Sequence, residues 1–232
     1  MKTEVIGSSS KGNCIVVEDV LMLDCGVSYS KIKNSLSKVK LIFISHSHQD
    51  HLLPSTIKKI AYNYPTIKFL TGSEEVVKKL VDCNINAKNI YILPSKRDYS
   101  YFDSYNTKWY DLGLLKVQLQ GLYHDTPNYA LKWEINNKKG VYIIDTASVE
   151  HIKAKNYDLY LIESNYNEEL LNQHIQECIE NGDNENKLYY LHRVPRVHLS
   201  DTQCNDFLIE NMGSNSEYIK LHQSSYNYKE ID

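Results

Sequence analysis

The residues with the clearest chemical potential form one short segment, residues 46–51, which reads His-Ser-His-Gln-Asp-His. It places three imidazoles and a carboxylate within six residues, directly after the apolar run 41–44. Neutral imidazole nitrogens and carboxylate oxygens are ligands that suit zinc and similar divalent ions. His46 and His48 are two positions apart, so both side chains point to the same side of an extended segment. The alternative interpretation is a histidine-rich surface loop, which accounts less well for the preceding apolar run.

Three polar residues further along the chain also stand beside apolar runs. His124 follows the run 115–122, Asp145 follows the run 141–144, and His198 has an apolar neighbour on each side. Each of them alone would most simply be a hydrogen-bonded polar residue at the end of a strand. Taken together and in this order, they predict the additional ligands that a centre with two metal ions needs.

Short strand patterns alternate with helical patterns along the chain, and these elements must bring the candidate ligands together. We expect strands at residues 3–6, 14–18, 21–24, 41–45, 67–71, 115–119, 129–135, 141–144, 159–163 and 217–221. We expect helices at residues 28–36, 54–62, 73–81, 167–180 and 202–211. Residues 181–186 are interpreted as a polar loop, and residues 95–110 fit no element. Without an internal repeat or a dividing linker, the pattern predicts one domain, residues 1–232, in which two packed sheets carry helices outside.

Composition limits the function classes. The net charge of −3 gives no strongly basic surface for nucleic acid, although bound metal ions and a few arginines can still hold a phosphate. No apolar run approaches the length of about 18 residues that a membrane span needs. The N-terminus has no apolar segment typical of a signal peptide. The five cysteines form no Cys-x-x-Cys pair, which favours free thiols in the cytoplasm.

The order of these motifs resembles that of the metallo-β-lactamase-fold hydrolases over nearly the whole chain. An early Asp24 in a Leu-Asp-Cys-Gly segment precedes residues 46–51, and the three later candidates follow in the family's order. The resemblance implies an α/β (α+β) fold, a four-layer αββα sandwich of two mixed sheets with outer helices. The metals would lie at one edge of the paired sheets.

The resemblance also implies roles for individual residues. The first metal would be held by His46, His48 and His124, the second by Asp50, His51 and His198, and Asp145 would bridge both. Asp24 would orient a ligand histidine from behind, although a turn-forming aspartate before Gly26 would look the same. Zn²⁺ is the expected ion because the ligands are rich in histidine, with Mn²⁺ as the alternative.

Within that superfamily, four segments resemble the WalJ/YycJ-type branch, a group of predicted exonucleases. They are residues 7–13, 124–127, 163–166 and 198–200. The branch implies a two-metal phosphodiester hydrolase, a nuclease or exonuclease acting on DNA or RNA through a metal-bridging hydroxide. Asp50 and Asp145 would then be essential to catalysis as well as to metal binding.

A proton donor for the leaving oxygen is the second catalytic requirement. Glu163 ends a predicted strand, and in related phosphodiesterases an acid at a similar place orients a histidine that protonates the leaving group. His192 is the best candidate partner for Glu163 in the sequence. The competing interpretation of His192 is a surface histidine.

Several polar residues are candidates for contacts with substrate phosphate. Arg193 and Arg196 stand just before the His198 motif, and Arg side chains can bind phosphate oxygens in a forked geometry. Ser8 and Asn13, together with Ser9 and Lys11 of the same polar segment, could line the cleft. Solvated arginines and an ordinary polar turn are the alternatives.

The expected partner is therefore a nucleic acid or nucleotide substrate, with no membrane, and a homodimer is left open. The main alternative to a nuclease is a small-molecule phosphodiesterase that acts on cyclic nucleotides. Hydrolysis of lactams, thioesters or lactones is a third class, against which the flanking motifs argue. A metal-binding protein without catalysis would not need the full ligand set.

Overall fold

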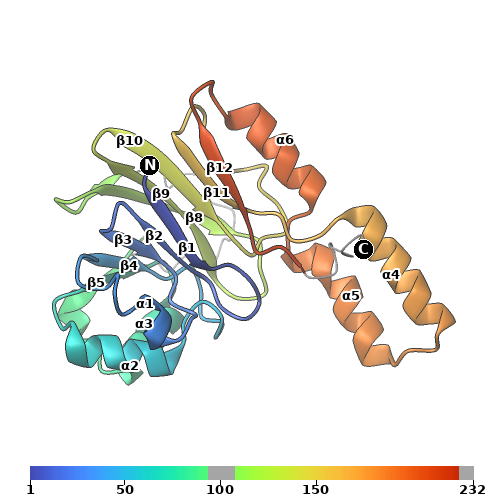
Figure 1. Cartoon of the computed structure of the whole chain (residues 1–232), viewed down its shortest axis with the longest axis horizontal. Helices are drawn as coiled ribbons and strands as arrows, with labels where there is room; N and C mark the ends of the chain where they lie inside the picture. Colours follow the sequence, from blue (N-terminus) through green and yellow to red (C-terminus); the bar gives the residue numbers. More distant parts are fainter. Residues whose placement is uncertain (94–107, 225–232) are drawn as a thin grey trace.

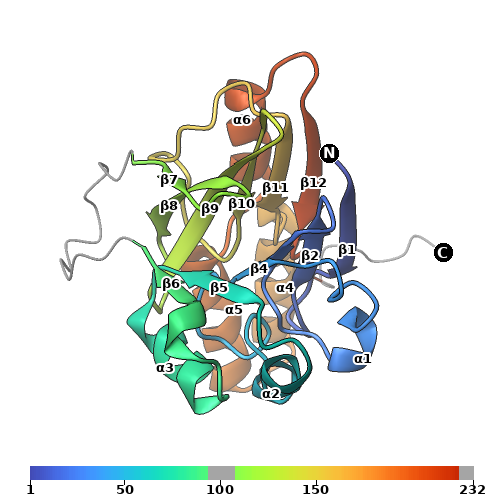
Figure 2. The same ribbon diagram turned by 90° about the vertical axis from the view of Figure 1, so that its left-hand side faces the viewer.

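Two six-stranded mixed sheets pack face to face, with helices on the outside (Figures 1 and 2). The computed structural model describes residues 1–93 and 108–224, so most of the unassigned segment 95–110 lies outside the described residues. The expected fold class, two mixed sheets with outer helices, is confirmed. None of the described helices combines the length and apolar character that crossing a bilayer requires.

The N-terminal sheet has the strand order β1-β2-β3-β4-β5-β6. Its strands are β1 Thr3–Gly7, β2 Cys14–Val17, β3 Leu21–Leu23, β4 Leu41–Phe43, β5 Lys68–Thr71 and β6 Ile90–Ile92. The first three strands pair antiparallel, and β3 to β6 pair parallel. The connections of this parallel half contain α1 Tyr29–Ile32, α2 Pro54–Asn63, α3 Glu74–Asp82 and the short 3-10 helix Ala87–Asn89. Apolar side chains of the helices pack on the outer face of the sheet.

The C-terminal sheet has the order β12-β11-β10-β9-β8-β7. Its strands are β7 Tyr110–Asp111, β8 Lys116–Leu122, β9 Asn128–Ile135, β10 Lys138–Ile143, β11 Leu159–Glu163 and β12 Glu217–Leu221. Helix α6, Asp201–Asn211, packs on its outer face. Helices α4, Glu168–Glu180, and α5, Glu185–Val197, pack against each other and project away from both sheets (Figure 1).

The two sheets share a core built by the alternation of side chains along the strands. On β9, Leu131 and Trp133 point into the space between the sheets, whereas Ala130 belongs to the cluster beneath α6. Gly140 on β10 faces Trp133, where a Cβ would come within 2.1 Å of the indole ring. The glycine therefore makes room for the largest side chain of the core.

Helix α5 is the main difference from the sequence prediction, which placed only a polar loop before His198. Asn184 caps this helix by accepting a hydrogen bond from the backbone of Lys187, and Pro195 lies in its last turn. A proline inside an apparent helix usually marks its end, and the buried side chains of α5 are few. The predicted helix 28–36 is also shorter, since only residues 29–32 are helical. Strands β6 and β7 were not predicted.

Lys132 on β9 is a buried lysine whose removal should stabilise the protein. Its side chain is 4% exposed, its Nζ donates to Gln120 Oε1 at 2.9 Å, and burial lowers its pKa to about 8. The unfolded lysine, with a pKa of about 10.4, keeps its proton at a pH where the folded one has lost it. The free energy of unfolding should therefore rise with pH between these two values. Lys132→Met should abolish this rise and stabilise the protein by about 1–3 kcal/mol at pH 7, measured by urea denaturation. An unchanged pH dependence in the variant would contradict the prediction.

Gly26 lies where two backbone segments meet without space for a side chain. A Cβ on Gly26 would lie 1.6 Å from the carbonyl oxygen of Asp50. Gly26→Ala should therefore destabilise the protein by about 3 kcal/mol or more, because a backbone atom cannot yield as a side chain can. Gly182→Ala is the matched control, because Gly182 has a positive φ of 70° but nothing within 4 Å of its added Cβ. Gly182→Ala should lower the free energy of unfolding by only about 1 kcal/mol. If urea denaturation gave equal losses for both variants, the clash at Gly26 would not be the cause.

Candidate metal centre

The candidate ligands meet because several strands of both sheets end at one place. Asp24 follows β3, Asp145 lies just beyond β10, and His222 follows β12. These three residues share a left-handed backbone, with φ values of 57°, 51° and 52°. Such a conformation is uncommon outside glycine, and clusters of it mark functional sites. The chain thus turns sharply at these three strand ends.

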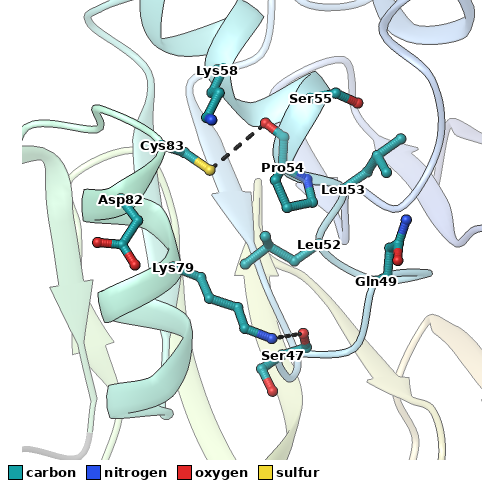
Figure 3. Close-up of a pocket in the computed structure, with 10 residues that line it drawn as sticks. All are labelled: Ser47, Gln49, Leu52, Leu53, Pro54, Ser55, Lys58, Lys79, Asp82 and Cys83. Atoms are coloured by element: carbon teal, nitrogen blue, oxygen red, sulfur yellow. Dashed lines mark hydrogen bonds between the residues drawn. The ribbon is translucent and has the colours of Figure 1, made fainter.

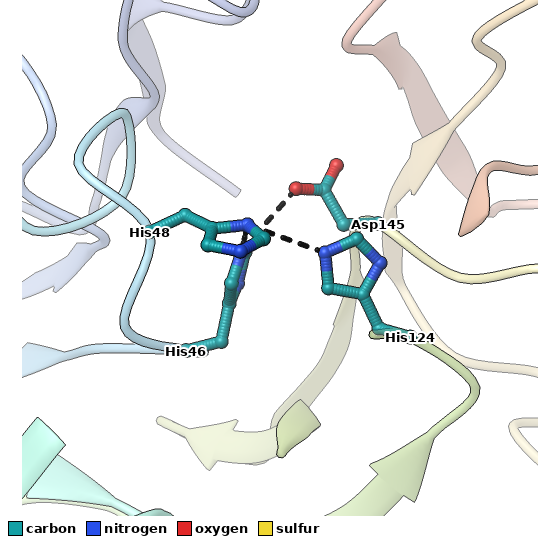
Figure 4. Close-up of side chains that lie close together, drawn as sticks. All are labelled: His46, His48, His124 and Asp145. Carbon is teal, nitrogen blue, oxygen red and sulfur yellow. Dashed lines mark hydrogen bonds and ion pairs between the residues drawn. The ribbon is translucent and has the colours of Figure 1, made fainter. Parts of the chain in front are cut away.

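The first half of the centre contains three histidines around one point (Figure 4). His46 Nε2 lies 3.0 Å from His48 Nδ1, and His124 Nε2 lies 3.4 Å from the same atom. Asp145 Oδ2 is 3.5 Å from His46 Nε2. Ligand atoms that bind a tetrahedral zinc at about 2.0–2.1 Å lie roughly 3.3 Å apart, so the four side chains fit one such ion.

The second half of the centre lies on the other side of Asp145. His51 Nε2 is 2.9 Å from Asp145 Oδ2 and 3.4 Å from Asp50 Oδ2. His222 Nε2 is 4.0 Å from Asp50 Oδ2, is buried, and has no hydrogen-bond partner within the described part of the chain. An unsatisfied buried nitrogen facing a carboxylate is costly in a folded protein unless a cation completes the site. These residues therefore fit a second divalent ion.

Buried partners fix the orientation of the ligand rings. Asp24 Oδ2 accepts hydrogen bonds from His51 Nδ1 at 2.6 Å and from the Tyr142 hydroxyl at 2.7 Å. His124 Nδ1 donates to the backbone oxygen of Val197 at 3.2 Å. In both histidines the Nδ1 contact leaves Nε2 facing the centre, as is usual for metal-binding imidazoles. The structure thus places Asp24 behind a candidate ligand histidine, the arrangement that the resemblance implied.

His198 lies beside the second half of the centre and forms a group of possible metal ligands with Asp145, Glu163 and His222, which includes neither Asp50 nor His51. Its Nδ1 lies 2.7 Å from Glu163 Oε1 and 3.6 Å from Asp145 Oδ1. Among the described residues, no contact joins His198 to Asp50 or His51. The buried carboxylate of Glu163 also lies 3.0 Å from Nδ1 of His222. Glu163 therefore connects His198 with the metal centre.

The predicted pairing of Glu163 with His192 is wrong. His192 is exposed on α5, whereas Glu163 is fully buried and contacts His198 instead. The helix turns the side chain of His192 to solvent and ends at His198, its C-cap residue. His222 was missed by the sequence analysis, although it follows the predicted strand 217–221 as directly as Asp24 follows its own strand.

The two halves of the centre differ in charge. Burial lowers the pKa of His46 and of His124. Burial also acts to lower the pKa of His222, but the carboxylates of Asp145 and Glu163 outweigh it and raise the pKa to about 10. In His51, the opposing effect of burial is likewise outweighed by Asp145 and Asp24, which hold its pKa well above the usual range. A cation bound in the second half must therefore displace protons.

The expected phosphate contacts lie at both sides of the centre. Arg193 forms an ion pair with Asp125, next to His124, and Arg196 is exposed near the end of α5. Ser8 and Asn13 belong to the second half of the centre. The hydroxyl of Ser8 accepts the backbone N–H of His222 at 2.8 Å. The amide of Asn13 lies 3.0 Å from His51 Nε2. Both side chains thus support candidate ligand residues.

The two mixed sheets, their outer helices and the His/Asp cluster define a metallo-β-lactamase fold with a candidate site for divalent metal. Solved structures with this architecture are similar over almost the whole chain. The short form of human tRNase Z matches with a TM-score of 0.65 and 13% identity, covering 97% of this chain and 93% of its own. YhfI from Bacillus subtilis matches with a TM-score of 0.67 and 14% identity, covering 97% and 87%. Zn²⁺-bound PqqB from Methylobacterium extorquens matches with a TM-score of 0.60 and 12% identity, covering 98% and 90%. No protein-family model and no curated protein sequence matches the chain.

Proposed function

We propose that the protein is a two-metal phosphodiester hydrolase that acts as a nuclease on DNA or RNA. The observation that carries this proposal is the pair of the buried Glu163 and the partly buried His198 beside the carboxylate of Asp145. Hydrolysis of a phosphodiester needs a proton for the leaving oxygen as well as a nucleophile, and such a pair can supply one. The names of two similar structures, tRNase Z and a long-form RNase Z from yeast, agree with this chemistry.

The geometry favours a revised set of ligands. In this proposal His46, His48 and His124 would hold the first metal, Asp50, His51 and His222 would hold the second, and Asp145 would contribute to both sites. Compared with the expectation from the sequence, His222 replaces His198 on the second metal. Zn²⁺ is the proposed ion because histidines dominate the set, and Mn²⁺ is the alternative. Two such ions would supply an activated water near neutral pH and neutralise charge on a phosphate.

Glu163 and His198 then act together on the leaving group. Burial acts to lower the pKa of His198, but the charge of Glu163 and its hydrogen bond outweigh it and raise the pKa above its usual value. The imidazole of His198 therefore keeps its proton to a higher pH than an ordinary histidine does. Because Nδ1 is held by Glu163, the proton on Nε2 is the one available for the leaving oxygen. His198 takes the role of general acid that the sequence suggested for His192.

Helix α5 offers a path for a polynucleotide. Tyr189, Arg193 and Arg196 are spaced by four and three residues, so they lie on one stripe of the helix. Tyr189 is 71% exposed, and the ion pair of Arg193 with Asp125 brings the stripe to the metal centre. Exposed tyrosines can stack with bases, and arginines can bind phosphates. This stripe favours a polynucleotide strand over a cyclic mononucleotide as the substrate.

The test is turnover by protein reconstituted with Zn²⁺ or Mn²⁺, with Asp145→Ala as the inactive control. The substrates are single- and double-stranded DNA and RNA labelled at the 5′ or the 3′ end, together with cyclic mononucleotides. We expect the wild type, but not Asp145→Ala, to cleave the polymers. The end label that is released first gives the polarity of cleavage. Turnover of cyclic nucleotides alone would replace the nuclease with the alternative phosphodiesterase. Equal activity of Asp145→Ala would contradict the metal mechanism.

A further inference from the structure

A second feature beside the metal centre is a polar hollow of about 480 Å³ that shares Asp50 as part of its wall. Its other lining residues come from the loop after β1, the segment from Gly26 through α1, and the start of α2. They include two lysines, Lys11 and Lys31, and two serines, Ser10 and Ser28. The hollow therefore adjoins the second half of the centre, whereas Arg193 lies beside the first half.

Backbone hydrogen bonds tie these segments together. The N–H of Asn13 donates to the oxygen of Asp50 at 2.7 Å, and the N–H of Gly26 donates to the oxygen of Asn13 at 2.9 Å. The N–H of Leu53 donates to the oxygen of Cys25 at 3.0 Å. Because the absent side chain of Gly26 lets the segments meet, the hollow has a fixed shape relative to Asp50. A preformed site binds a ligand without the cost of ordering a loop.

The chemistry of the lining favours an anion. Within the described residues, neither Lys11 nor Lys31 has an ion pair. Of the described residues that line the wall, Asp50 alone is acidic, and its Oδ2 also faces His51 and His222. Ammonium and hydroxyl groups are common partners of phosphate oxygens in nucleic-acid complexes. The lining contains no aromatic side chain on which a base could stack.

A larger hollow on the other side of the ligand loop, of about 530 Å³, lacks these properties (Figure 3). Its Lys79 donates to the backbone oxygen of Ser47, which lies between His46 and His48, at 2.7 Å. Its wall includes Asp82 and none of the candidate ligands. Lys79 thus supports the loop. Unlike the smaller hollow, which shares Asp50 with the centre, the larger hollow shares no described lining residue with the candidate ligands.

We propose that the hollow of Lys11 and Lys31 binds a phosphate of the substrate strand next to the scissile phosphate. This proposal rests on the proposed nuclease function. It places the continuation of the substrate strand on the side of the second half of the centre. The strand would then run from the α5 stripe, across the metals, to the hollow. Single mononucleotides and small diesters would leave the hollow unused.

The test compares Lys11→Ala/Lys31→Ala with the matched control Lys33→Ala/Lys40→Ala, which removes two exposed lysines outside the hollow. The kcat/KM for a single-stranded oligonucleotide is measured relative to that for bis(p-nitrophenyl) phosphate, at several salt concentrations. For the hollow variant we expect this ratio to fall on the order of tenfold. The slope of log kcat/KM against log salt should become shallower by about 0.7 for each phosphate that the variant no longer neutralises. The control should keep the wild-type ratio and slope.

Two results would overturn the proposal, and they are distinguishable. If the wild type cleaves oligonucleotides but the hollow variant keeps the wild-type ratio and slope, the hollow does not bind the strand. If the wild type ignores oligonucleotides and hydrolyses only cyclic nucleotides, the nuclease function fails, and the assignment of the hollow fails with it. Charge reversal, Lys11→Glu/Lys31→Glu, should weaken oligonucleotide turnover further than the alanine variant does.

Discussion

Replacing His222 with alanine is expected to reduce the bound metal from two ions to one per chain and to lower kcat by more than about 100-fold. The buried Nε2 of His222 has no hydrogen-bond partner among the described residues and faces Asp50, so its removal takes one ligand from the second ion. Loss of an outer partner of a metal ligand already costs about 10–100-fold, and loss of a ligand should cost at least as much. Elemental analysis of the purified variant after dialysis against zinc measures the stoichiometry.

The control for this experiment is His192→Ala, because His192 is exposed on α5 and away from Glu163. It should bind two ions and retain full activity. A His222→Ala protein that keeps both ions, beside a His198→Ala protein that loses one, would restore His198 as the ligand of the second metal. The two histidines are therefore distinguished by metal content alone, without reference to a substrate.

Replacing His198 with alanine is expected to leave both metal ions bound and to lower kcat by about 10²–10⁴-fold, the usual contribution of a general acid. The loss should depend on the leaving group. p-Nitrophenolate departs without a proton, so bis(p-nitrophenyl) phosphate should be hydrolysed almost as well by the variant, whereas an oligonucleotide should not. Glu163→Gln should show the same pattern in weaker form, because Glu163 acts through His198.

The pH profile gives an independent check on His198. The active form is protonated, and the charge of Glu163 outweighs the effect of burial to raise the pKa of His198 above its usual value. The kcat of the wild type should consequently fall as the pH rises through that raised pKa, and His198→Ala should lack this decline. If the variant lost the same factor on both substrates and kept the alkaline decline, His198 would not be the proton donor.

Much of the fold could be predicted because strand patterning survives in a single sequence. Alternating or continuous apolar runs bounded by turns marked most strands of both sheets, and the predicted helix 73–81 is found as α3, which Ser73 caps. Strand β7 has only two residues, and β6 contains no buried residue, whereas the equally short β3 and β4 are fully buried. Helix α5 was not predicted because its buried face is narrow and because a proline such as Pro195 usually ends a helix.

The difference between the ligands expected from the sequence and those we propose, His198 and His222, has the same physical origin. Val197 and Leu199 give His198 apolar neighbours, so the end of a helix resembled the end of a strand. His222 follows β12, whose exposed Glu217 and Tyr218 weaken its pattern, and no motif surrounds it. The loop 46–51 was recognisable because its ligands are local, whereas the partners of Glu163 are fixed only by tertiary contacts.

The base of the α4–α5 hairpin is closed by the chain itself. The N–H of Asn165 donates to the oxygen of Leu199 at 2.9 Å, and the N–H of Asp201 donates to the oxygen of Tyr166 at 2.8 Å. The two helices also have an apolar cluster of their own. Residues 167–197 thus form a helical hairpin whose two ends are held together by these backbone hydrogen bonds, beside Glu163 and His198. Under the proposed function, a hairpin of other length or charge on the same stem would change which nucleic acids bind, while Glu163 and His198 keep their places.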